Sequence, residues 1–113
     1  MTYPNHLGAQ RKRWKLSNHE LAQLLGYRFK SAVFRAEKNA RPPTIKFALA
    51  CEIVFGKSAC ELFPTFYAEI EDAVMRRAAK FDEAIRGDRS RKANLNRELL
   101  RLMAERAHNR DRA

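Results

Sequence analysis

Helix start and stop signals follow one another closely in the first half of the chain. Ser17-Asn18-His19-Glu20 has the spacing of a capping box, in which the Ser17 hydroxyl accepts from the Glu20 amide and the Glu20 carboxylate accepts from the Ser17 amide. The helix that this box opens ends at Gly26. Thr44 is placed to cap another helix through Phe55. A chain interrupted this often can form only short helices.

The remaining signals in this half are also helical. Pro4 suits the first turn of a helix to about Trp14, with Leu7, Arg11 and Trp14 on one stripe. Residues 30–38 are expected to form a further helix. Arg41-Pro42-Pro43 must break the chain after it. Ser58 caps a brief fifth helix through Leu62. No stretch alternates apolar and polar residues as a half-buried strand does. The sequence therefore predicts an all-α domain of five helices over residues 1–64.

Beyond Pro64 the apolar residues follow a longer amphipathic pattern. Six of them recur at steps of three and four residues: Tyr67, Ile70, Val74, Ala78, Phe81 and Ile85. Gly87-Asp88 interrupts this helix, and Ser90 can cap a last one that carries Leu95, Leu99, Leu102 and Met103. Residues 104–113 are polar, and we expect them to fray. Residues 65–113 thus form a helical extension of one or two amphipathic helices, whose apolar stripe needs either the domain or another chain to cover it.

Positive charge is concentrated at one end of the chain. Up to Phe47 there are ten Lys and Arg against two Glu, a net charge of +8, whereas the remainder has thirteen against eleven, a net charge of +2. Such an imbalance points to a surface that binds a polyanion. Solubility alone is the simpler explanation of an excess of Lys and Arg, but it does not account for their concentration in one part.

Several classes of protein are not expected from this sequence. No apolar run approaches the roughly 20 residues that span a bilayer, and no secretory leader is evident, so we expect a cytoplasmic protein. Cys51 and Cys60 are most simply free thiols, and neither they nor the three histidines have the close pairings that a zinc site needs. There is no phosphate-cradling glycine loop and no nucleophile with a base. We therefore expect no enzyme, cofactor, metal or small-molecule ligand.

Two short helices joined by a glycine-containing turn, the second of them cationic, suggest a helix-turn-helix. From Leu16 to Gly26 and from Ser31 to Glu37 the sequence resembles the phage-repressor-like helix-turn-helix family, the type of the lambda and 434 repressors and Cro, also called the XRE family. The resemblance continues through Phe55-Gly56-Lys57-Ser58-Ala59-Cys60-Glu61-Leu62-Phe63 and covers about residues 5–63. It implies a repressor-like DNA-binding domain of bacterial or phage origin.

The resemblance also implies roles for single residues. Arg11 and Glu37 match a structural ion pair between the first and third helices. Residues at positions that face base edges in the major groove are Phe29, Lys30, Ser31 and Arg35. Residues at or near positions that contact DNA phosphates are Asn18, Arg28, Lys38, Asn39 and Arg41.

The helical positions of the third helix agree with these roles. Val33, Ala36 and Glu37 share one side, while Lys30, Ser31, Phe34 and Arg35 point away from it. Lys and Arg suit the O6 and N7 acceptors of guanine. Phe34 has two interpretations of equal weight: its ring packs on a thymine methyl, or it lies in the core under the fourth helix.

We therefore expect a sequence-specific, double-stranded DNA-binding transcriptional regulator, acting as a dimeric repressor on a palindromic operator. The candidate dimer or partner residues are Tyr67, Ile70, Val74, Phe81, Ile85, Leu95, Leu99 and Leu102. One alternative is an antitoxin or antiactivator whose C-terminal helices wrap on a protein partner. A weaker one treats residues 86–112 as a basic arm for RNA, although acidic residues dilute its charge.

Overall fold

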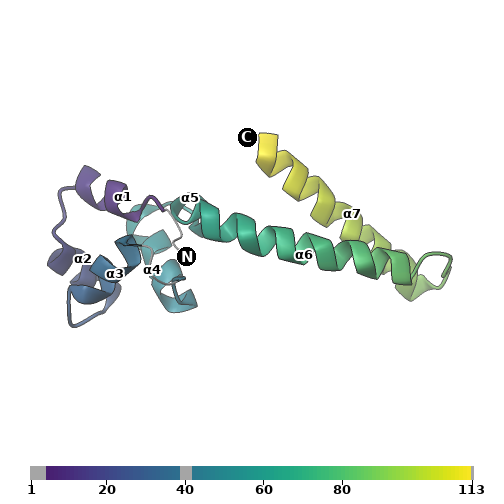
Figure 1. Ribbon diagram of the computed structural model, residues 1–113, viewed down its shortest axis with the longest axis horizontal. Coiled ribbons are helices and arrows are strands. Elements are labelled where there is room, and N and C mark those ends of the chain that lie inside the picture. Colours follow the sequence, from purple (N-terminus) through teal and green to yellow (C-terminus); the bar gives the residue numbers. More distant parts are fainter. Residues whose placement is uncertain (1–4, 39–41, 113) are drawn as a thin grey trace. The chain divides into compact units, whose positions relative to one another are not determined.

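The computed structural model describes residues 5–38 and 42–112, and this part of the chain is helical without any strand (Figure 1). The chain divides into two compact units, residues 1–68 and 69–113. No helix in the described part is long and apolar enough to cross a membrane. The helices are α1 (Leu7–Arg13), α2 (Asn18–Leu25), α3 (Ser31–Glu37), α4 (Ile45–Phe55), α5 (Ala59–Leu62), α6 (Pro64–Ala84) and α7 (Arg91–Arg112).

The local signals that open these helices act as the sequence predicts. Ser17 forms the complete capping box with Glu20 at the start of α2, and Ser58 forms another with Glu61 at the start of α5. The Thr44 hydroxyl accepts from the Phe47 amide at 3.1 Å, and the Ser90 hydroxyl accepts from the Ala93 amide at 3.1 Å. Gly26 and Gly56 end α2 and α4 in the left-handed conformation, with φ of 85° and 64°. All four caps and both helix ends are confirmed.

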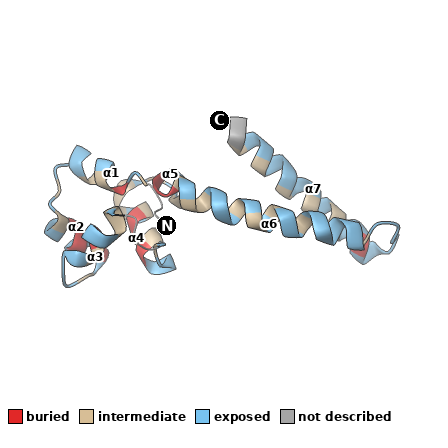
Figure 2. Cartoon of the chain, in the orientation of Figure 1, coloured by how far each residue is buried: buried red, intermediate tan, exposed pale blue. Residues whose placement is uncertain are grey.

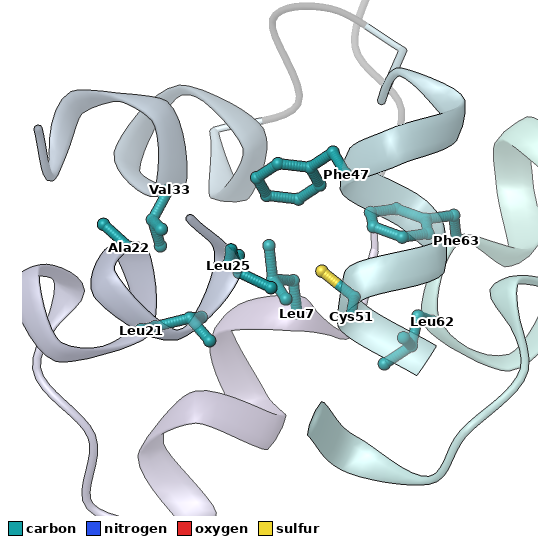
Figure 3. Packing of buried hydrophobic residues seen from close by; sticks show 9 residues of the cluster. All are labelled: Leu7, Leu21, Ala22, Leu25, Val33, Phe47, Cys51, Leu62 and Phe63. Atoms are coloured by element: carbon teal, nitrogen blue, oxygen red, sulfur yellow. The ribbon is translucent and has the colours of Figure 1, made fainter. Parts of the chain in front are cut away.

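Apolar side chains from α1 to α5, together with Phe63, make one core in the first unit (Figure 3). Its buried members are Leu7, Leu21, Ala22, Leu25, Val33, Phe47, Cys51, Leu62 and Phe63. The His6 amide donates to the Leu62 carbonyl at 2.8 Å, which ties the start of α1 to the end of α5. The core thus fixes α3 through Val33 and α2 through Leu21 and Leu25, and these two helices carry the candidate site.

In the second unit the chain reverses between Ile85 and Ser90, and α7 runs back at an angle to α6 (Figure 1). The Arg97 guanidinium donates to the Ile85 carbonyl at 3.0 Å beside this turn. Arg110 pairs with Glu71 near the other end of the two helices. Ala93, near the start of α7, is buried, and most other described residues of this unit are exposed or half-buried (Figure 2). The described part of residues 69–113 is therefore a helical hairpin whose two helices have few contacts with each other.

Several predictions about helix bounds and faces are wrong. α6 starts at Pro64, because proline lacks only an amide that the first helical turn leaves unpaired in any case. α6 ends at Ala84, one residue before Ile85, the last residue of the predicted stripe. The C-terminus is helical to Arg112 where fraying was expected from residue 104. Trp14 does not share the buried side of Leu7; its ring is 59% exposed, with the Arg13 guanidinium 5.5 Å from its centre. α1 begins at Leu7, and Pro4 lies outside the described residues.

Candidate nucleic-acid interface

α3 presents its two sides to different surroundings. Val33 is fully buried in the core, and Ala36 and Glu37 are half-buried on the same side. The other side exposes Lys30, Ser31, Phe34 and Arg35, the residues that the sequence places away from the core. A short helix held by one apolar side is thereby left with an open cationic side.

Phe34 belongs to the open side of α3. Its side chain is 51% exposed, and the Lys38 ammonium lies 5.1 Å from the centre of its ring. The alternative that placed this ring in the core is excluded. Phe29 is 66% exposed, with the Arg28 guanidinium 5.6 Å from its ring centre. Each exposed ring of this region is thus accompanied by a cation, which is an arrangement that suits both the apolar and the anionic parts of a nucleic acid.

A hollow of about 690 Å³ lies between the start of α2 and the open side of α3. Its lining residues are Arg11, Ser17, Asn18, His19, Lys30, Ser31 and Phe34. It brings the predicted phosphate residue Asn18 together with the predicted base-reading residues Lys30, Ser31 and Phe34. Phe29, Arg28, Arg35 and Lys38 are not among its lining residues. Asn39 and Arg41 lie outside the described residues.

Asn18 stands at the first position of α2, where backbone amides are not yet paired within the helix. Its Oδ1 atom is buried and has no hydrogen-bond partner among the described residues. The neighbouring Glu20 carboxylate accepts from the Ser17 amide at 2.8 Å, and this backbone hydrogen bond is the main reason why the pKa of Glu20 is lowered. An anion at this helix start would therefore meet one carboxylate as well as the basic side chains.

Arg11 and Glu37 hold α3 to α1 through two parallel hydrogen bonds. Arg11 Nε donates to Glu37 Oε2 at 2.6 Å, and the second terminal nitrogen donates to Oε1 at 3.1 Å. The first terminal nitrogen donates to the Leu16 carbonyl at 2.9 Å. The side chains are only 14% and 15% exposed, and the hydrogen bond to Glu37 raises the pKa of Arg11. The structure thus brings together the two residues that the sequence pairs.

Gly8 is a structural residue of this site that the sequence reasoning missed. A Cβ atom at Gly8 would lie 3.1 Å from Glu37 Oε1, so any larger residue there would require the carboxylate to shift by a few tenths of an ångström. The position of Gly8, one helical turn before Arg11 on α1, is the only signal in the sequence.

Among residues 5–38 and 42–112, no three His, Cys, Asp or Glu side chains gather closely enough to hold a metal ion. No family model matches the chain, and no curated protein and no solved structure matches it.

Proposed function

We propose that this protein is a sequence-specific regulator of transcription that binds double-stranded DNA by placing the open side of α3 in the major groove. The observation that carries the proposal is the division of α3 into one side buried through Val33 and one that exposes Lys30, Phe34 and Arg35 beside the start of α2. The major groove of B-form DNA admits one α-helix and displays acceptors to Lys and Arg and a methyl group to an aromatic ring.

The roles of the individual side chains follow from their positions. Lys30, Ser31, Phe34 and Arg35 read base edges, together with Phe29 just before the helix. Asn18 and the start of α2 hold one DNA phosphate, and Arg28 and Lys38 contact phosphates on either side of the groove. The Arg11–Glu37 ion pair keeps α3 at a fixed position relative to α1 while these contacts form.

A single helix of this length contacts few base pairs, each worth about 1–3 kcal/mol. Because a genome offers many competing sites, we propose that the protein acts as a homodimer whose two copies of α3 bind half-sites one helical turn apart. The operator is then palindromic, and repression follows where the operator overlaps a promoter.

The proposal is tested by selecting bound duplexes from a random pool with the wild-type chain and then measuring variants on the recovered and on unrelated duplexes. We expect Lys30→Ala and Arg35→Ala to lower the affinity for the recovered duplex roughly ten- to a hundred-fold and to change binding to unrelated duplexes little. Lys38→Ala should weaken binding to all duplexes and reduce the salt dependence. Lys92→Ala on the exposed surface of α7 is the matched control and should change neither.

Two results would count against this proposal. If the selection recovered no preferred duplex, the protein would not be a sequence-specific regulator. If Lys30→Ala and Arg35→Ala weakened the recovered and the unrelated duplexes equally, α3 would not be the element that reads bases.

A further inference from the structure

The turn between α1 and α2 contains a residue in an unfavourable backbone conformation. Lys15 has a φ of 57°, in the left-handed region that is disfavoured for any residue with a Cβ atom. The other residues with positive φ in the described chain are Gly26, Gly56 and Gly87, which have no Cβ atom. Among residues 5–38 and 42–112, the chain thus adopts this conformation without glycine at position 15 alone.

The two hydrogen bonds that end α1 require the left-handed conformation. The Leu16 amide donates to the Arg11 carbonyl at 3.1 Å, and the Lys15 amide donates to the Lys12 carbonyl at 3.0 Å. Together they form a Schellman motif, in which the residue just after the helix cap is left-handed and is usually glycine. Glycine at position 15 would therefore end α1 in the same way at a lower cost in free energy.

No contact within the described part of the chain accounts for a lysine at this position. The Lys15 side chain is exposed and makes no ion pair or hydrogen bond with any described residue. The negative end of the α1 dipole favours a cation here, but for an exposed side chain that effect is smaller than the cost of the left-handed conformation. Strained residues concentrate at functional sites, which directs attention to a ligand of the Lys15 ammonium group.

The surroundings of Lys15 are cationic and aromatic. The four exposed residues 12–15, Lys-Arg-Trp-Lys, form one segment that we call the α1–α2 corner. The Arg13 guanidinium lies 5.5 Å from the centre of the Trp14 ring. The first acidic residue of the chain is Glu20, and its carboxylate is engaged in the capping box of α2. None of the three cations of the corner makes an ion pair within the described residues.

The corner leads directly into the start of α2, which belongs to the candidate nucleic-acid interface (Figure 1). Arg11 donates to the Leu16 carbonyl at 2.9 Å and also to Glu37, so one guanidinium fixes the turn to α3. Lys15 precedes Asn18 by three residues, which span about 11 Å at most. Successive phosphates of one DNA strand advance by about 3.4 Å along the helix axis. A strand with a phosphate at the start of α2 therefore has further phosphates within reach of the Lys15 side chain.

We propose that Lys15 contacts a DNA phosphate next to the one held at the start of α2, and that Lys12 and Arg13 strengthen the positive field there. The charge of Lys15 raises the affinity for DNA, while its conformation lowers the stability of the fold. Because a phosphate carries no sequence information, this contact adds to the affinity for every duplex. The inference rests on the proposed function, since it requires a bound duplex.

Three substitutions at position 15 separate the charge from the conformation. We expect Lys15→Gly to lower the affinity for recovered and unrelated duplexes alike, roughly three- to ten-fold, and to reduce the slope of log affinity against log salt by about 0.9. It should also raise the melting temperature by roughly 4–8 °C, because the strain is relieved. Lys15→Ala should lower the affinity equally without this rise, and Lys15→Arg should change neither quantity. Lys57→Ala, between α4 and α5, removes the same charge elsewhere and should leave the affinity and the slope unchanged.

Trp14 gives a direct signal from the corner, because it is the only tryptophan of the chain. Its side chain is 59% exposed, so acrylamide quenches its fluorescence readily in the free protein. We expect a saturating amount of the recovered duplex to lower the quenching constant of Trp14. An unchanged constant would show that the bound DNA does not approach the corner and would overturn the proposal.

Other results would also overturn it. An equal loss of affinity in Lys15→Arg and Lys15→Gly would show that the lysine does not act through its charge. A Lys15→Gly variant no more stable than the wild type would show that the lysine is not strained. A loss confined to single-stranded RNA of the same length would assign the corner to RNA.

Failure of this inference can be told apart from failure of the proposed function. If Lys15→Gly left the affinity and the slope unchanged while Lys30→Ala weakened binding to the recovered duplex, the corner contact alone would be wrong. If the selection recovered no preferred duplex but Lys15→Gly weakened binding to all duplexes, the corner contact would stand and the sequence-specific regulator would not.

Discussion

At the scale of single residues, the Arg11–Glu37 ion pair joins two helices that share few other contacts. Both side chains are mostly buried, and Glu37 fills the space beside Gly8. Charge reversal in Glu37→Arg would leave two guanidinium groups facing each other with little access to water. We expect this change to lower the free energy of unfolding by about 2–3 kcal/mol, a fall of roughly 10–20 °C in the melting temperature.

A thermal melt followed by circular dichroism measures this fall. Glu105→Arg is the control, because it disrupts the exposed pair with Arg101 and should change stability by about 0.5 kcal/mol or less. Equal melting temperatures for Glu37→Arg and the wild type would show that the ion pair does not stabilise the domain.

Cys51 is the buried cysteine, and its surroundings suppress ionisation. Burial raises the pKa of its thiol to about 12 from the 9.0 of an exposed cysteine. Above pH 9 the unfolded chain releases this proton while the folded chain retains it, so the stabilising contribution is present below pH 9 and is lost as the pH rises toward 12. We expect the contribution to fall by about 1.4 kcal/mol for each pH unit in this window.

Denaturant titrations at pH 8.5 and 10 measure this effect in Cys51→Ala and Cys60→Ala. The loss of stability with pH should be smaller in Cys51→Ala than in Cys60→Ala, which retains the buried thiol. The same loss in both variants would mean that other groups account for it.

At the scale of elements, the stability of α4 depends on its N-cap residue, Thr44, as well as on its apolar side chains. Thr44 accepts from the Phe47 amide, and Phe47 is buried in the core, so the cap and the core contact lie within one turn. We expect Thr44→Ala to destabilise the domain by about 1 kcal/mol. Thr65→Ala, an exposed threonine within the first turn of α6, is the control in the same urea titration and should be close to neutral. A smaller effect at Thr44 than at Thr65 would contradict this role.

The caps also show which parts of the fold can be predicted from the sequence. Ser17, Thr44, Ser58 and Ser90 each bind an amide three residues away, so the signal and its effect lie within one short segment. The buried side of α3 was likewise recognisable, because Val33 and Ala36 repeat at helical spacing. These features required no knowledge of distant contacts.

The features that were missed depend on contacts between distant residues or on competing local effects. The helix beyond residue 104 is accompanied by the Arg110–Glu71 pair, whose partners are far apart in the sequence. Trp14 is a large aromatic residue of a kind often found in cores, and only the packing of the other helices leaves it exposed.

At the scale of the whole molecule, the two compact units have separate tasks in our proposals. The first unit carries the candidate DNA contacts, and the second carries the candidate dimer residues of α6 and α7. This division means that changes in one unit should leave the intrinsic property of the other intact. It also means that affinity for a palindromic operator depends on both units, because a dimer that has bound one half-site holds its second α3 at a high effective concentration near the other.

The wild type should bind a duplex with both half-sites on the order of 10²–10⁴-fold more tightly than a duplex with one. Leu99→Glu should lose most of this advantage and keep the single half-site affinity, because its α3 is unchanged. Fluorescence anisotropy at one fixed salt concentration measures both constants, with Leu49→Glu as the control that retains the advantage. An undiminished advantage in Leu99→Glu would show that the two domains are coupled without the hairpin, through the DNA or through another surface of the first unit.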